Sequence, residues 1–441
     1  MSDHDRIRPR RPGLRHGLAI LTLFALAACS APTEPGADGA ELSADGPLTI
    51  TWYGSDARNK SVQEVVDAFG EQQQGIEITT QPTAFDSYWD RLSVQAASDN
   101  LPCVVAMQSR YEAKFEDRGS LLALDTLVQN GTIDVSGIDP KLLDSQRAAD
   151  GKLYAIPYGI WFEGAVLNET AIADAGVEPP DDQGSWTDYV AWAKQLQPKL
   201  PEGSYAIADR GGQITQFQSF ALGKGETLFG EKEVGFSRET LHEWFSLWTD
   251  ASADGVAPPA RVTAEENGVP GNANLLAKGK LVVSSTGDNN VSDSQAGLGD
   301  QGKLVLAPSP TAGKPQVVGT NSWSISANCT NVKQSVAFID YFIKSEDGAM
   351  TLKAQTGLPP VTSVRNAQAA SPEVDQAIKD RIALYEKVSQ AGALVDVWPD
   401  ATQQLVTQFT QTYEKVSFGQ LTVDQGVDEF ITQANTALSG F

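Results

Sequence analysis

Histidine is scarce in this sequence, which has only three in 441 residues. His4 and His16 lie close to the N-terminus, and only His242 stands in the body of the chain, within a helical pattern over 240–250. A surface or half-buried helical position is the ordinary interpretation of that residue. A Ser-His-Asp triad or a multi-histidine metal site is therefore very hard to build, and we predict neither a metal site nor a cofactor.

Positive charge is also in short supply. The chain has 33 Lys and Arg against 56 Asp and Glu, which gives a formal charge of −23. Such a field repels nucleic acid and anionic lipid, and no cluster of basic residues offsets it. We therefore predict no nucleic-acid partner. The charge also disfavours, without excluding, a highly anionic ligand.

Long hydrophobic runs are absent except near the N-terminus. There, five Arg precede an apolar run over 18–28 (LAILTLFALAA), which is shorter than the roughly 20 residues that a membrane-spanning helix needs. Small residues then lead to a cysteine, as at an export cleavage site. These features predict a signal peptide over 1–28.

Cys29 is the predicted anchor point. The segment Leu26, Ala27, Ala28 and Cys29 resembles the bacterial lipobox, in which the cysteine is lipidated and becomes the mature N-terminus. The alternative is an ordinary signal peptide that happens to end near a cysteine. Residues 29–47 are rich in Ala, Pro, Gly, Asp and Glu, so we predict a flexible tether. The body would then be anchored to the cell membrane, outside the cytoplasm, only through its lipid.

Cysteine is limited to three residues. If Cys29 is acylated, Cys103 and Cys329 are the only possible pair, and an exported protein can keep a disulfide. The alternative is two buried, reduced thiols. Zinc or thiol catalysis would need partner residues that this sequence does not supply.

The body of the chain is long enough for two domains. Removing 28 of the 441 residues leaves 413, which is too many for one core of ordinary size. Strand and helix signals alternate in the first half, which indicates a parallel sheet covered by helices. Strands are predicted over 48–53, 76–80 and 103–107, with helices over 61–73, where Ser61 and Glu64 have capping-box spacing, and 86–98.

The second half contains another mixed unit and a largely helical tail. Residues 151–158 and 164–167 are predicted to be extended, and Ser185 and Asp188 have the spacing of a capping box. Further strands are predicted over 205–208, 281–285, 304–306 and 317–326, and helices over 185–197, 213–222, 238–250, 332–343, 347–355, 372–388, 401–415 and 423–438.

Several short motifs occur in an ordered series. Residues 150–157 (DGKLYAIP) and 119–125 (GSLLALD) are the most specific, and 51–56 (TWYGSD), Asn168 and 357–360 (GLPP) stand in matching order around them. With these motifs the chain resembles the family 1 extracellular solute-binding proteins, the maltose-binding-protein cluster, over nearly its whole mature length. None of the motifs is diagnostic alone, but their order behind a lipobox is specific.

The resemblance implies an α/β, periplasmic-binding-protein-like fold. Two α/β lobes would be joined at a hinge, with the ligand held in the cleft between them. Carried over, lobe 1 would comprise 48–157 plus 301–335, and lobe 2 would comprise 158–300 plus 336–441. The helical tail would then pack mainly on lobe 2.

The resemblance also implies a function. The chain would be the extracytoplasmic substrate-binding component of an ABC importer, which captures a small carbohydrate by closing its hinge and delivers it to a membrane permease. We expect a monomer without enzyme activity. Three alternatives stay open: a binding protein for a non-sugar polar solute, a binding lobe that signals to a receptor, and an exported glycoside hydrolase, which needs only two carboxylates.

Candidate ligand-binding residues follow predicted strands, because ligands of open α/β sheets bind beyond the carboxyl ends of strands. After the first strand come Asp56, where the resembled family places a hydroxyl-binding carboxylate, and Arg58; a surface ion pair is the alternative. Arg110 follows the third strand, near the family's ligand-contacting loop. Trp161 occupies a position where family members contact ligand, and Glu163 is a weaker candidate beside it.

The remaining candidates lie in the second half. Asp288 and Asn289 stand where relatives often carry a tryptophan, so the departure predicts more polar recognition; a simple turn is the alternative. Asn321 and Trp323 lie on the family's glycine-rich return strand, where Trp323 faces either the cleft or the core. Trp398 stands where the family often has a stacking aromatic residue. In this fold Cys103 and Cys329 would belong to one lobe, which favours their pairing.

Overall fold

The computed structural model describes residues 42–73, 75–230, 232–288, 291–395 and 397–439. Within these ranges the chain builds one mixed sheet of nine strands, whose main path has the order β2-β1-β3-β8-β4-β6-β5. β7 pairs with β4, and β9 pairs with β8, off this path. The strands are β1 (Leu48–Tyr53), β2 (Ile78–Thr83), β3 (Val104–Gln108), β4 (Ala155–Asn168), β5 (Tyr205–Ile207), β6 (Leu281–Gly287), β7 (Leu304–Pro308), β8 (Val317–Ile325) and β9 (Leu394–Val395).

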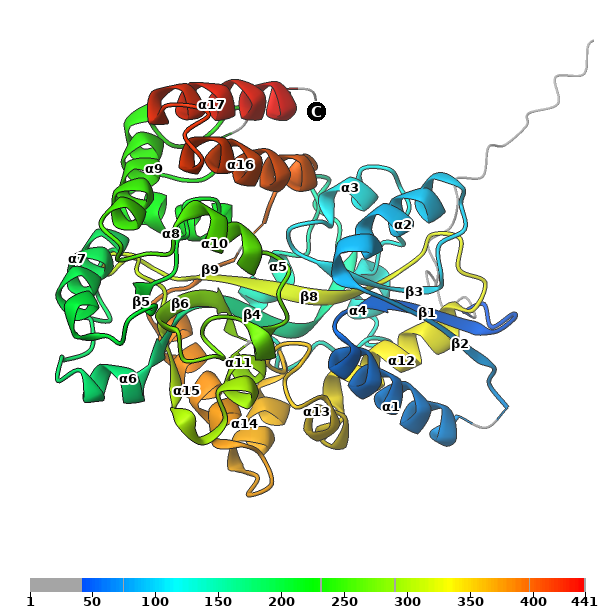
Figure 1. Ribbon diagram of the computed structural model, residues 1–441. Helices are drawn as coiled ribbons and strands as arrows, with labels where there is room; N and C mark the ends of the chain where they lie inside the picture. Colours follow the sequence, from blue (N-terminus) through cyan, green and yellow to red (C-terminus); the bar gives the residue numbers. More distant parts are fainter. Residues whose placement is uncertain (1–41, 74, 231, 289–290, 396, 440–441) are drawn as a thin grey trace, which may run out of the picture. The chain divides into compact units, whose positions relative to one another are not determined.

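Helices connect the strands and form the tail of the chain (Figure 1). The α-helices are α1 (Asp56–Gln72), α2 (Phe85–Ala97), α3 (Ala113–Glu116), α4 (Asp125–Gln129), α5 (Pro140–Asp144), α6 (Glu169–Asp174), α7 (Trp186–Leu196), α8 (Ile214–Gly223), α9 (Arg238–Ala253), α10 (Ala260–Glu266), α11 (Val291–Leu298), α12 (Val332–Lys344), α13 (Glu346–Leu352), α14 (Thr362–Ala370), α15 (Gln376–Gln390), α16 (Thr402–Ser417) and α17 (Val423–Ser439). Short 3-10 helices within the described ranges include η2 (Gln197–Lys199), η3 (Gly271–Ala273) and η5 (Gly299–Gln301).

The alternating first half forms the parallel arrangement that its sequence predicts. β1 pairs in parallel with both β2 and β3, with Leu48 opposite Ile78 and Ile50 opposite Val104. α1 and α2 connect these strands, and α1 buries Val62, Val65 and related apolar residues on one face. The parallel prediction is therefore confirmed for this part of the sheet.

Two local helix starts show how well capping signals predict boundaries. At α7 the predicted capping box is confirmed, because the Ser185 side chain accepts from the backbone N–H of Asp188 and the Asp188 side chain accepts from that of Ser185. At α1 the predicted capping box at Ser61 is wrong. The helix begins earlier, at Asp56, with Ser55 as its N-cap, so Ser61 lies inside it.

Strand β4 is the element that links the two halves of the sheet. Its first part, Ala155 to Phe162, pairs with β8, and its second part, from Glu163 to Asn168, pairs with β6 and β7. The sequence predicts two separate extended stretches here, whereas the structure joins them into one strand of 14 residues. The strand therefore changes partners between Phe162 and Glu163.

The buried apolar side chains separate into two main clusters, although the described residues all belong to one compact unit. The first cluster is built around β1, β3 and the early part of β4, and includes Trp323, which packs edge-on against Phe338 and Phe342. The second cluster contains three mutually packed tryptophans, Trp186, Trp244 and Trp248. A smaller third cluster lies around Val166, Leu281 and Leu298.

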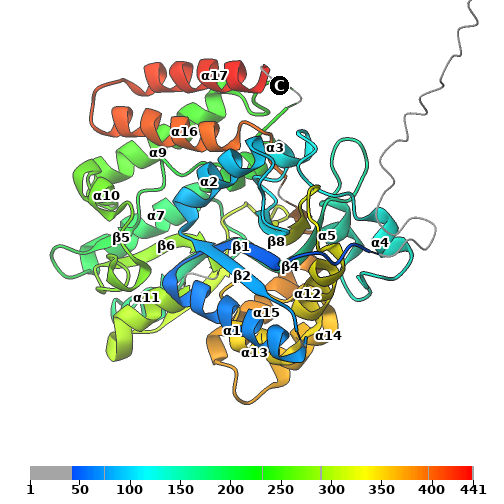
Figure 2. The same cartoon turned by 90° about the vertical axis from the view of Figure 1, so that its right-hand side faces the viewer.

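These clusters divide the chain differently from the predicted lobe boundaries. Helices α12 to α15 belong to the first cluster, so the expectation that the tail from residue 336 packs on lobe 2 is wrong for them. α16 and α17 contribute to the second cluster, and their assignment to lobe 2 stays a prediction. Figures 1 and 2 show α12 to α15 on one side of the sheet and α16 and α17 on the other. β7, predicted in lobe 1, pairs instead with the second part of β4.

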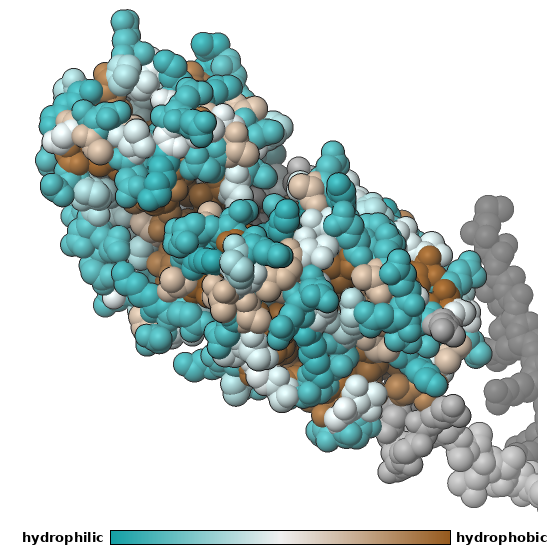
Figure 3. Space-filling model, turned by 90° about the horizontal axis from the view of Figure 1, so that it is seen from below, coloured by the Kyte–Doolittle hydropathy of each residue, from teal (hydrophilic) through white to brown (hydrophobic). Residues whose placement is uncertain are grey.

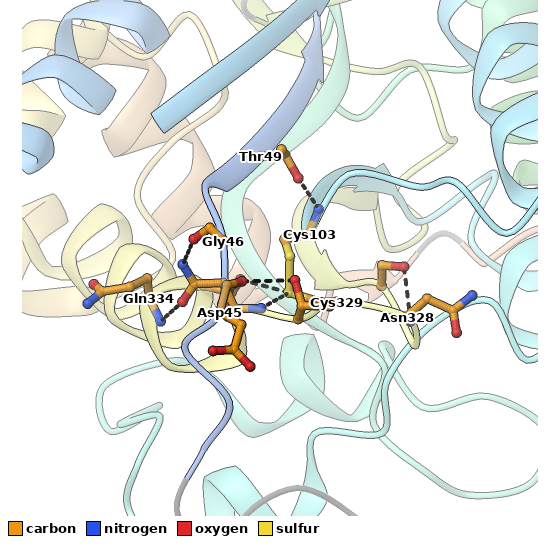
Figure 4. The surroundings of a disulfide bond; sticks show 11 residues. Asp45, Gly46, Thr49, Cys103, Asn328, Cys329 and Gln334 are labelled. Atoms are coloured by element: carbon orange, nitrogen blue, oxygen red, sulfur yellow. Dashed lines mark hydrogen bonds between the residues drawn. A yellow bond between two sulfur atoms is a disulfide. The ribbon is translucent and has the colours of Figure 1, made fainter. Parts of the chain in front are cut away.

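A disulfide joins Cys103, just before β3, to Cys329, beyond the end of β8 (Figure 4). The two cysteines lie close because β3 and β8 are antiparallel neighbours, with Val104 opposite Ile325. The backbone N–H of Cys103 also donates to Thr49 Oγ1 at 2.8 Å. The predicted pairing is confirmed, and Cys29 lies outside the described residues.

The face of the molecule seen in Figure 3 is mostly hydrophilic, and its hydrophobic residues appear in small groups rather than in one continuous patch. Among the described residues, the large apolar side chains that are exposed are Phe85, Val94, Leu394, Val397 and Phe418. None of the helices in the described ranges is both long and apolar enough to cross a membrane.

Candidate functional site

A cavity of about 450 Å³ is lined by residues from both main clusters. From the first cluster it takes Tyr53, and from the second it takes Trp398. Trp161 and Glu163 line it from β4, on either side of the point where that strand changes partners. The volume lies within the range of about 300–1,000 Å³ that is typical of small-molecule sites.

Residues at or just beyond strand ends form one part of the lining. Gly54, Ser55 and Arg58 follow β1, Arg110 and Tyr111 follow β3, and Gly287 ends β6. This is the edge at which ligands bind in open α/β sheets.

Aromatic rings form one part of the lining. Phe85, at the start of α2, is 36% exposed and packs edge-on against Tyr53, 5.2 Å between ring centroids. Behind it, Tyr111 stacks on Trp89, with centroids 4.2 Å apart and planes 13° from parallel. Trp161 adds a further ring to the wall. Rings held in place by their neighbours can receive a flat apolar ligand surface with little loss of side-chain entropy.

The ring of Trp161 depends on a glycine in the neighbouring strand. Gly319 lies opposite Trp161 in the pairing of β8 with β4, and a Cβ at that position would come within 2.0 Å of Trp161 Cζ2. Only glycine leaves the ring this space.

Arg110 connects the two tryptophans of the cavity. Its guanidinium carbon lies 4.2 Å from the Trp161 ring centroid and 4.9 Å from that of Trp398. Arg110 Nη1 also lies 3.7 Å from Glu163 Oε1, and Gln216 Nε2 donates to Glu163 Oε2 at 3.1 Å. The guanidinium is therefore fixed both by its ion pair and by cation–π contacts.

Arg58 supplies a second guanidinium from the first turns of α1. Its side chain is buried, its Nη2 donates to the Tyr158 hydroxyl at 2.9 Å, and its guanidinium carbon lies 4.5 Å from the Tyr53 ring centroid. Burial raises the pKa of Tyr53 well above its ordinary value, so this phenol stays neutral. Arg58 therefore keeps its positive charge beside two neutral tyrosines.

Asn321 contributes buried polar groups. Its Oδ1 accepts from the Tyr53 hydroxyl at 2.7 Å, and its Nδ2 donates to the backbone carbonyl of Thr356 at 2.8 Å. Gln108 Nε2 approaches the same Oδ1 at 3.5 Å. The cavity thus offers amide groups, carboxylate and guanidinium beside its aromatic rings, a mixture that can satisfy hydroxyl groups as well as apolar faces.

A second cavity, of about 380 Å³, adjoins the first and shares Gln213 and Asp293 with it. It is lined by Arg210, whose Nη2 donates to Ser284 Oγ, and by Asp209. Burial raises the pKa of Asp209 to about 6, even though the Tyr413 hydroxyl and the Gly211 N–H both donate to its carboxylate. Burial also raises the pKa of Asp293.

The structure brings together most of the residues that the sequence predicts for a binding site; contact with a ligand stays a prediction for each of them. The predicted residues that line the first cavity are Arg58, Arg110, Trp161, Glu163, Asn321 and Trp398.

Three predicted residues lie elsewhere, and Asn289 lies outside the described residues. Asp56 is exposed at the start of α1 and does not line the cavity, although its neighbour Ser55 does. Trp323 is fully buried in the first cluster, because β8 is covered on both faces there. Of the two positions left open for Trp323, the structure shows the one in the core, so its listing as a ligand-binding residue is corrected.

Asp288, which the sequence predicts to bind ligand, also lies away from the cavity lining. It is fully buried, and its Oδ2 lies 2.7 Å from Nη2 of Arg381 on α15, while its Oδ1 accepts from the backbone N–H of Phe162 at 3.1 Å. The carboxylate is thus occupied in holding α15 to the end of the first part of β4. Polar sequence at this turn indicated ligand recognition, whereas the structure uses Asp288 as an internal ion pair.

Sequence reasoning also missed residues that line the cavities. Gln213 and Thr215 come from the start of α8, which had no motif to mark it, and Tyr53 and Tyr111 stood unremarked beside predicted strand ends. Extending the strand-end rule to every polar or aromatic neighbour would have found the tyrosines. In the described ranges, no group of three or more His, Cys, Asp or Glu side chains is arranged to hold a metal ion.

Comparisons with known proteins identify relatives of this architecture. A family model described as "Bacterial extracellular solute-binding protein" matches residues 64–380. Among curated proteins, the maltooligosaccharide ABC transporter solute-binding lipoprotein of Streptococcus pneumoniae serotype 4 is 21% identical over 421 residues, which cover 88% of this chain and 90% of that protein.

Solved structures show the same two-lobed fold. The extracellular solute-binding protein family 1 member of Alicyclobacillus acidocaldarius is 24% identical with a TM-score of 0.69, covering 90% of this chain and 100% of that one. The GacH receptor of Streptomyces glaucescens, solved with acarbose, is 21% identical with a TM-score of 0.74, covering 90% and 100%. An oligogalacturonide-binding protein of Yersinia enterocolitica, with digalacturonic acid, is 19% identical with a TM-score of 0.76, covering 89% and 99%.

Proposed function

The chain belongs to the family of bacterial extracellular solute-binding proteins, and from this premise we propose that it captures an oligosaccharide for an ABC importer. The family is extracellular by description, so the chain works outside the cytoplasm. One observation carries the proposal of a sugar ligand: the 450 Å³ cavity combines ring faces with guanidinium, carboxylate and amide groups. The C–H faces of sugars stack on aromatic rings, and their hydroxyls need both donors and acceptors.

The relatives support a sugar as the ligand class. One is named as a maltooligosaccharide transporter lipoprotein, and others were solved with acarbose or digalacturonic acid. These names describe those proteins, and they share with this chain the fold that surrounds the cavity. Together with the lining residues, they favour a carbohydrate over a peptide or a polyamine.

The proposed mechanism is capture by hinge closure. A ligand that contacts Tyr53 from the first cluster and Trp398 from the second binds best when the two clusters approach, so it shifts the population toward the closed form. Bending at the partner change of β4, between Phe162 and Glu163, would move Trp161 and Glu163 together with the hinge. The closed monomer would then dock on permease subunits, and no covalent chemistry is involved.

We further propose that Cys29, which lies outside the described residues, carries a lipid that anchors the protein to the cell membrane. The curated relative in Streptococcus pneumoniae is described as a lipoprotein. Labelling cells with a fatty-acid analogue should mark the wild-type protein and leave Cys29→Ala unmarked. Equal labelling of both proteins would contradict the anchor.

The ligand proposal is tested by a thermal-unfolding screen against neutral and acidic sugars, peptides and polyamines. A matching ligand at a hundredfold excess over its dissociation constant stabilises the protein by about 2.7 kcal/mol. Trp161→Ala should abolish the shift, whereas Trp192→Ala should keep it, because Trp192 is a partly buried tryptophan of α7 that does not line the cavity.

Two outcomes would contradict the proposal. If peptides or polyamines stabilise the protein while no sugar does, the carbohydrate assignment fails. If a stabilising sugar is hydrolysed during incubation, and products appear in stoichiometric excess over the protein, the chain is an enzyme rather than a capture protein.

A further inference from the structure

In the ranges that the structure describes, Arg58 is a buried cation without a carboxylate ion pair. It is 7% exposed and lines the first cavity, yet among the described residues the charged and polar groups that act on it are two tyrosines, Tyr53 and Tyr158. Its Nε is buried without a hydrogen-bond partner. Burying a guanidinium without a carboxylate costs free energy that neutral partners recover only in part.

Arg210 repeats this situation in the second cavity. In the described part of the chain its Nη2 donates to Ser284 Oγ, and its Nε is buried without a hydrogen-bond partner. Asp209, Glu163 and Glu266 act on it electrostatically, but none of these carboxylates forms an ion pair with it. The nearest in sequence, Asp209, is occupied by Tyr413.

Other buried arginines of the described chain are treated differently. Arg381 has Asp288 at 2.7 Å, and Arg365 has Glu386 at 2.9 Å. Arg110, in the first cavity, has Glu163. Among the described arginines, Arg365 and Arg381 are thus buried and paired with carboxylates. Arg58, which is buried, and Arg210, which is half-buried, lack such an ion pair where they line a cavity.

The two cavities that these arginines line adjoin each other. They share Gln213 and Asp293, so they adjoin at these side chains, and their volumes are about 450 and 380 Å³. Arg58 comes from α1 in the first part of the chain, and Arg210 follows β5. An amide and a carboxylate between them suit hydroxyl groups, since both can accept from a sugar O–H.

We propose that the ligand is an acidic oligosaccharide, whose uronic-acid carboxylates pair with Arg58 in one cavity and with Arg210 in the other. This inference rests on the proposed function and specifies the ligand class. A carboxylate gives the guanidinium the planar, charge-assisted partner that the protein withholds. The formal charge of −23 repels anions in general, so recognition comes from these two local pairings and discriminates against anions that cannot make them.

The first experiment uses the wild-type protein alone and needs no variant. Isothermal titration compares trigalacturonate with its methyl ester, which keeps the shape of the sugar and removes the charge. The acid should bind at least tenfold more tightly, since a hydrogen bond to a charged group contributes more than a neutral one. Equal affinities of acid and ester would overturn the inference.

The second experiment assigns the charges to residues. Arg58→Gln and Arg210→Gln should each weaken binding of the acid at least tenfold more than they weaken binding of the methyl ester. Lys60→Gln is the matched control, because Lys60 is an exposed cation of the same helix as Arg58. Loss of acid and ester binding in parallel would show that the arginines are structural, and would overturn the assignment.

Further ligands separate this inference from the function on which it rests. Sulfated and phosphorylated trisaccharides offer the same charge in a tetrahedral group, and tighter binding of either would overturn the carboxylate assignment. If maltotriose binds tightly and the acid does not, capture of sugar stands and the acidic ligand fails. If no sugar binds while another solute does, the proposed function itself fails.

Discussion

Opening the disulfide between Cys103 and Cys329 is expected to lower the free energy of unfolding more than almost any surface change. The bond closes a loop with a sequence separation of 226, which contains most of the second cluster. The chain-entropy relation gives about 5 kcal/mol at 25 °C for a loop of this length, while measured disulfides more often contribute about 2–4 kcal/mol. We therefore expect a loss of about 2–5 kcal/mol.

The assay is urea unfolding at pH 7, followed by both tryptophan fluorescence and far-UV circular dichroism. The wild-type protein is compared with Cys103→Ala/Cys329→Ala, and each is measured with and without a reductant. Reduction should move the wild-type midpoint to that of the double variant and leave the double variant unchanged. Using two probes checks that both hydrophobic clusters unfold together, which a single free energy requires.

The reduced wild type is the decisive control, because it opens the bond while keeping both sulfur atoms in place. Cys329 Sγ also accepts a hydrogen bond from the Asn331 N–H at 3.3 Å, which the alanine variant loses. If oxidised and reduced wild type unfold within about 1 kcal/mol of each other, the entropic reasoning is refuted for this loop.

Three further predictions concern the cavities and the ion pair beside them. Gly319→Ala should weaken sugar binding at least tenfold by calorimetry, because its Cβ would meet the Trp161 ring at 2.0 Å; an unchanged dissociation constant would contradict this. Burial raises the pKa of Asp209 to about 6 in the folded protein, so the folded state binds this proton more tightly than the unfolded state does. The free energy of unfolding should therefore fall by about 3 kcal/mol as the pH rises from about 4 to 6. Asp209→Asn should flatten that slope in urea unfolding; an identical slope would disprove the assignment. Asp288→Asn should lower thermal stability by about 3–5 kcal/mol, because Arg381 stays buried; Asp288→Asn/Arg381→Met should recover most of the loss, and no recovery would argue against the pair.

The fold could be predicted from the sequence wherever a local pattern specifies local structure. Strand and helix signals alternate along the chain from Leu48–Tyr53 to Val104–Gln108, and this order predicted parallel strands. The Ser185 capping box marked the start of α7. The start of α1 could not be predicted in this way. Its first turn, after Ser55, carries polar residues, so no apolar periodicity marks it. Arg58 is buried there, and the hydrophobic pattern does not predict the burial of a charged side chain.

Packing partners were harder to predict than elements. A helix such as α12 shows its apolar face in sequence, but nothing in the pattern says which cluster that face will cover. Its Phe338 and Phe342 pack on Trp323, a contact between segments that sequence spacing does not connect. For the same reason the role of Asp288 could not be predicted, because its partner Arg381 lies 93 residues further along the chain.

The residues of the candidate site also differ in whether local sequence could predict them. Residues next to strand ends, such as Arg58 and Arg110, could be found because topology brings those ends to one edge. Trp323 could not be placed, since every residue of β8 after the first is buried and alternation no longer separates two faces. The second cavity around Arg210 is lined by residues of β6, α10 and α11, whose assembly local patterns do not determine.

Both hydrophobic clusters are assembled from distant parts of the chain, and this has a consequence for biosynthesis. The first cluster needs α15, which ends at Gln390, and the second needs α17, which ends at Ser439. A nascent chain that has emerged only as far as β8 therefore lacks a complete core in either part, and its apolar strands stay accessible to chaperones. For a chain proposed to work outside the cytoplasm, such late completion of both clusters would keep it unfolded while export begins.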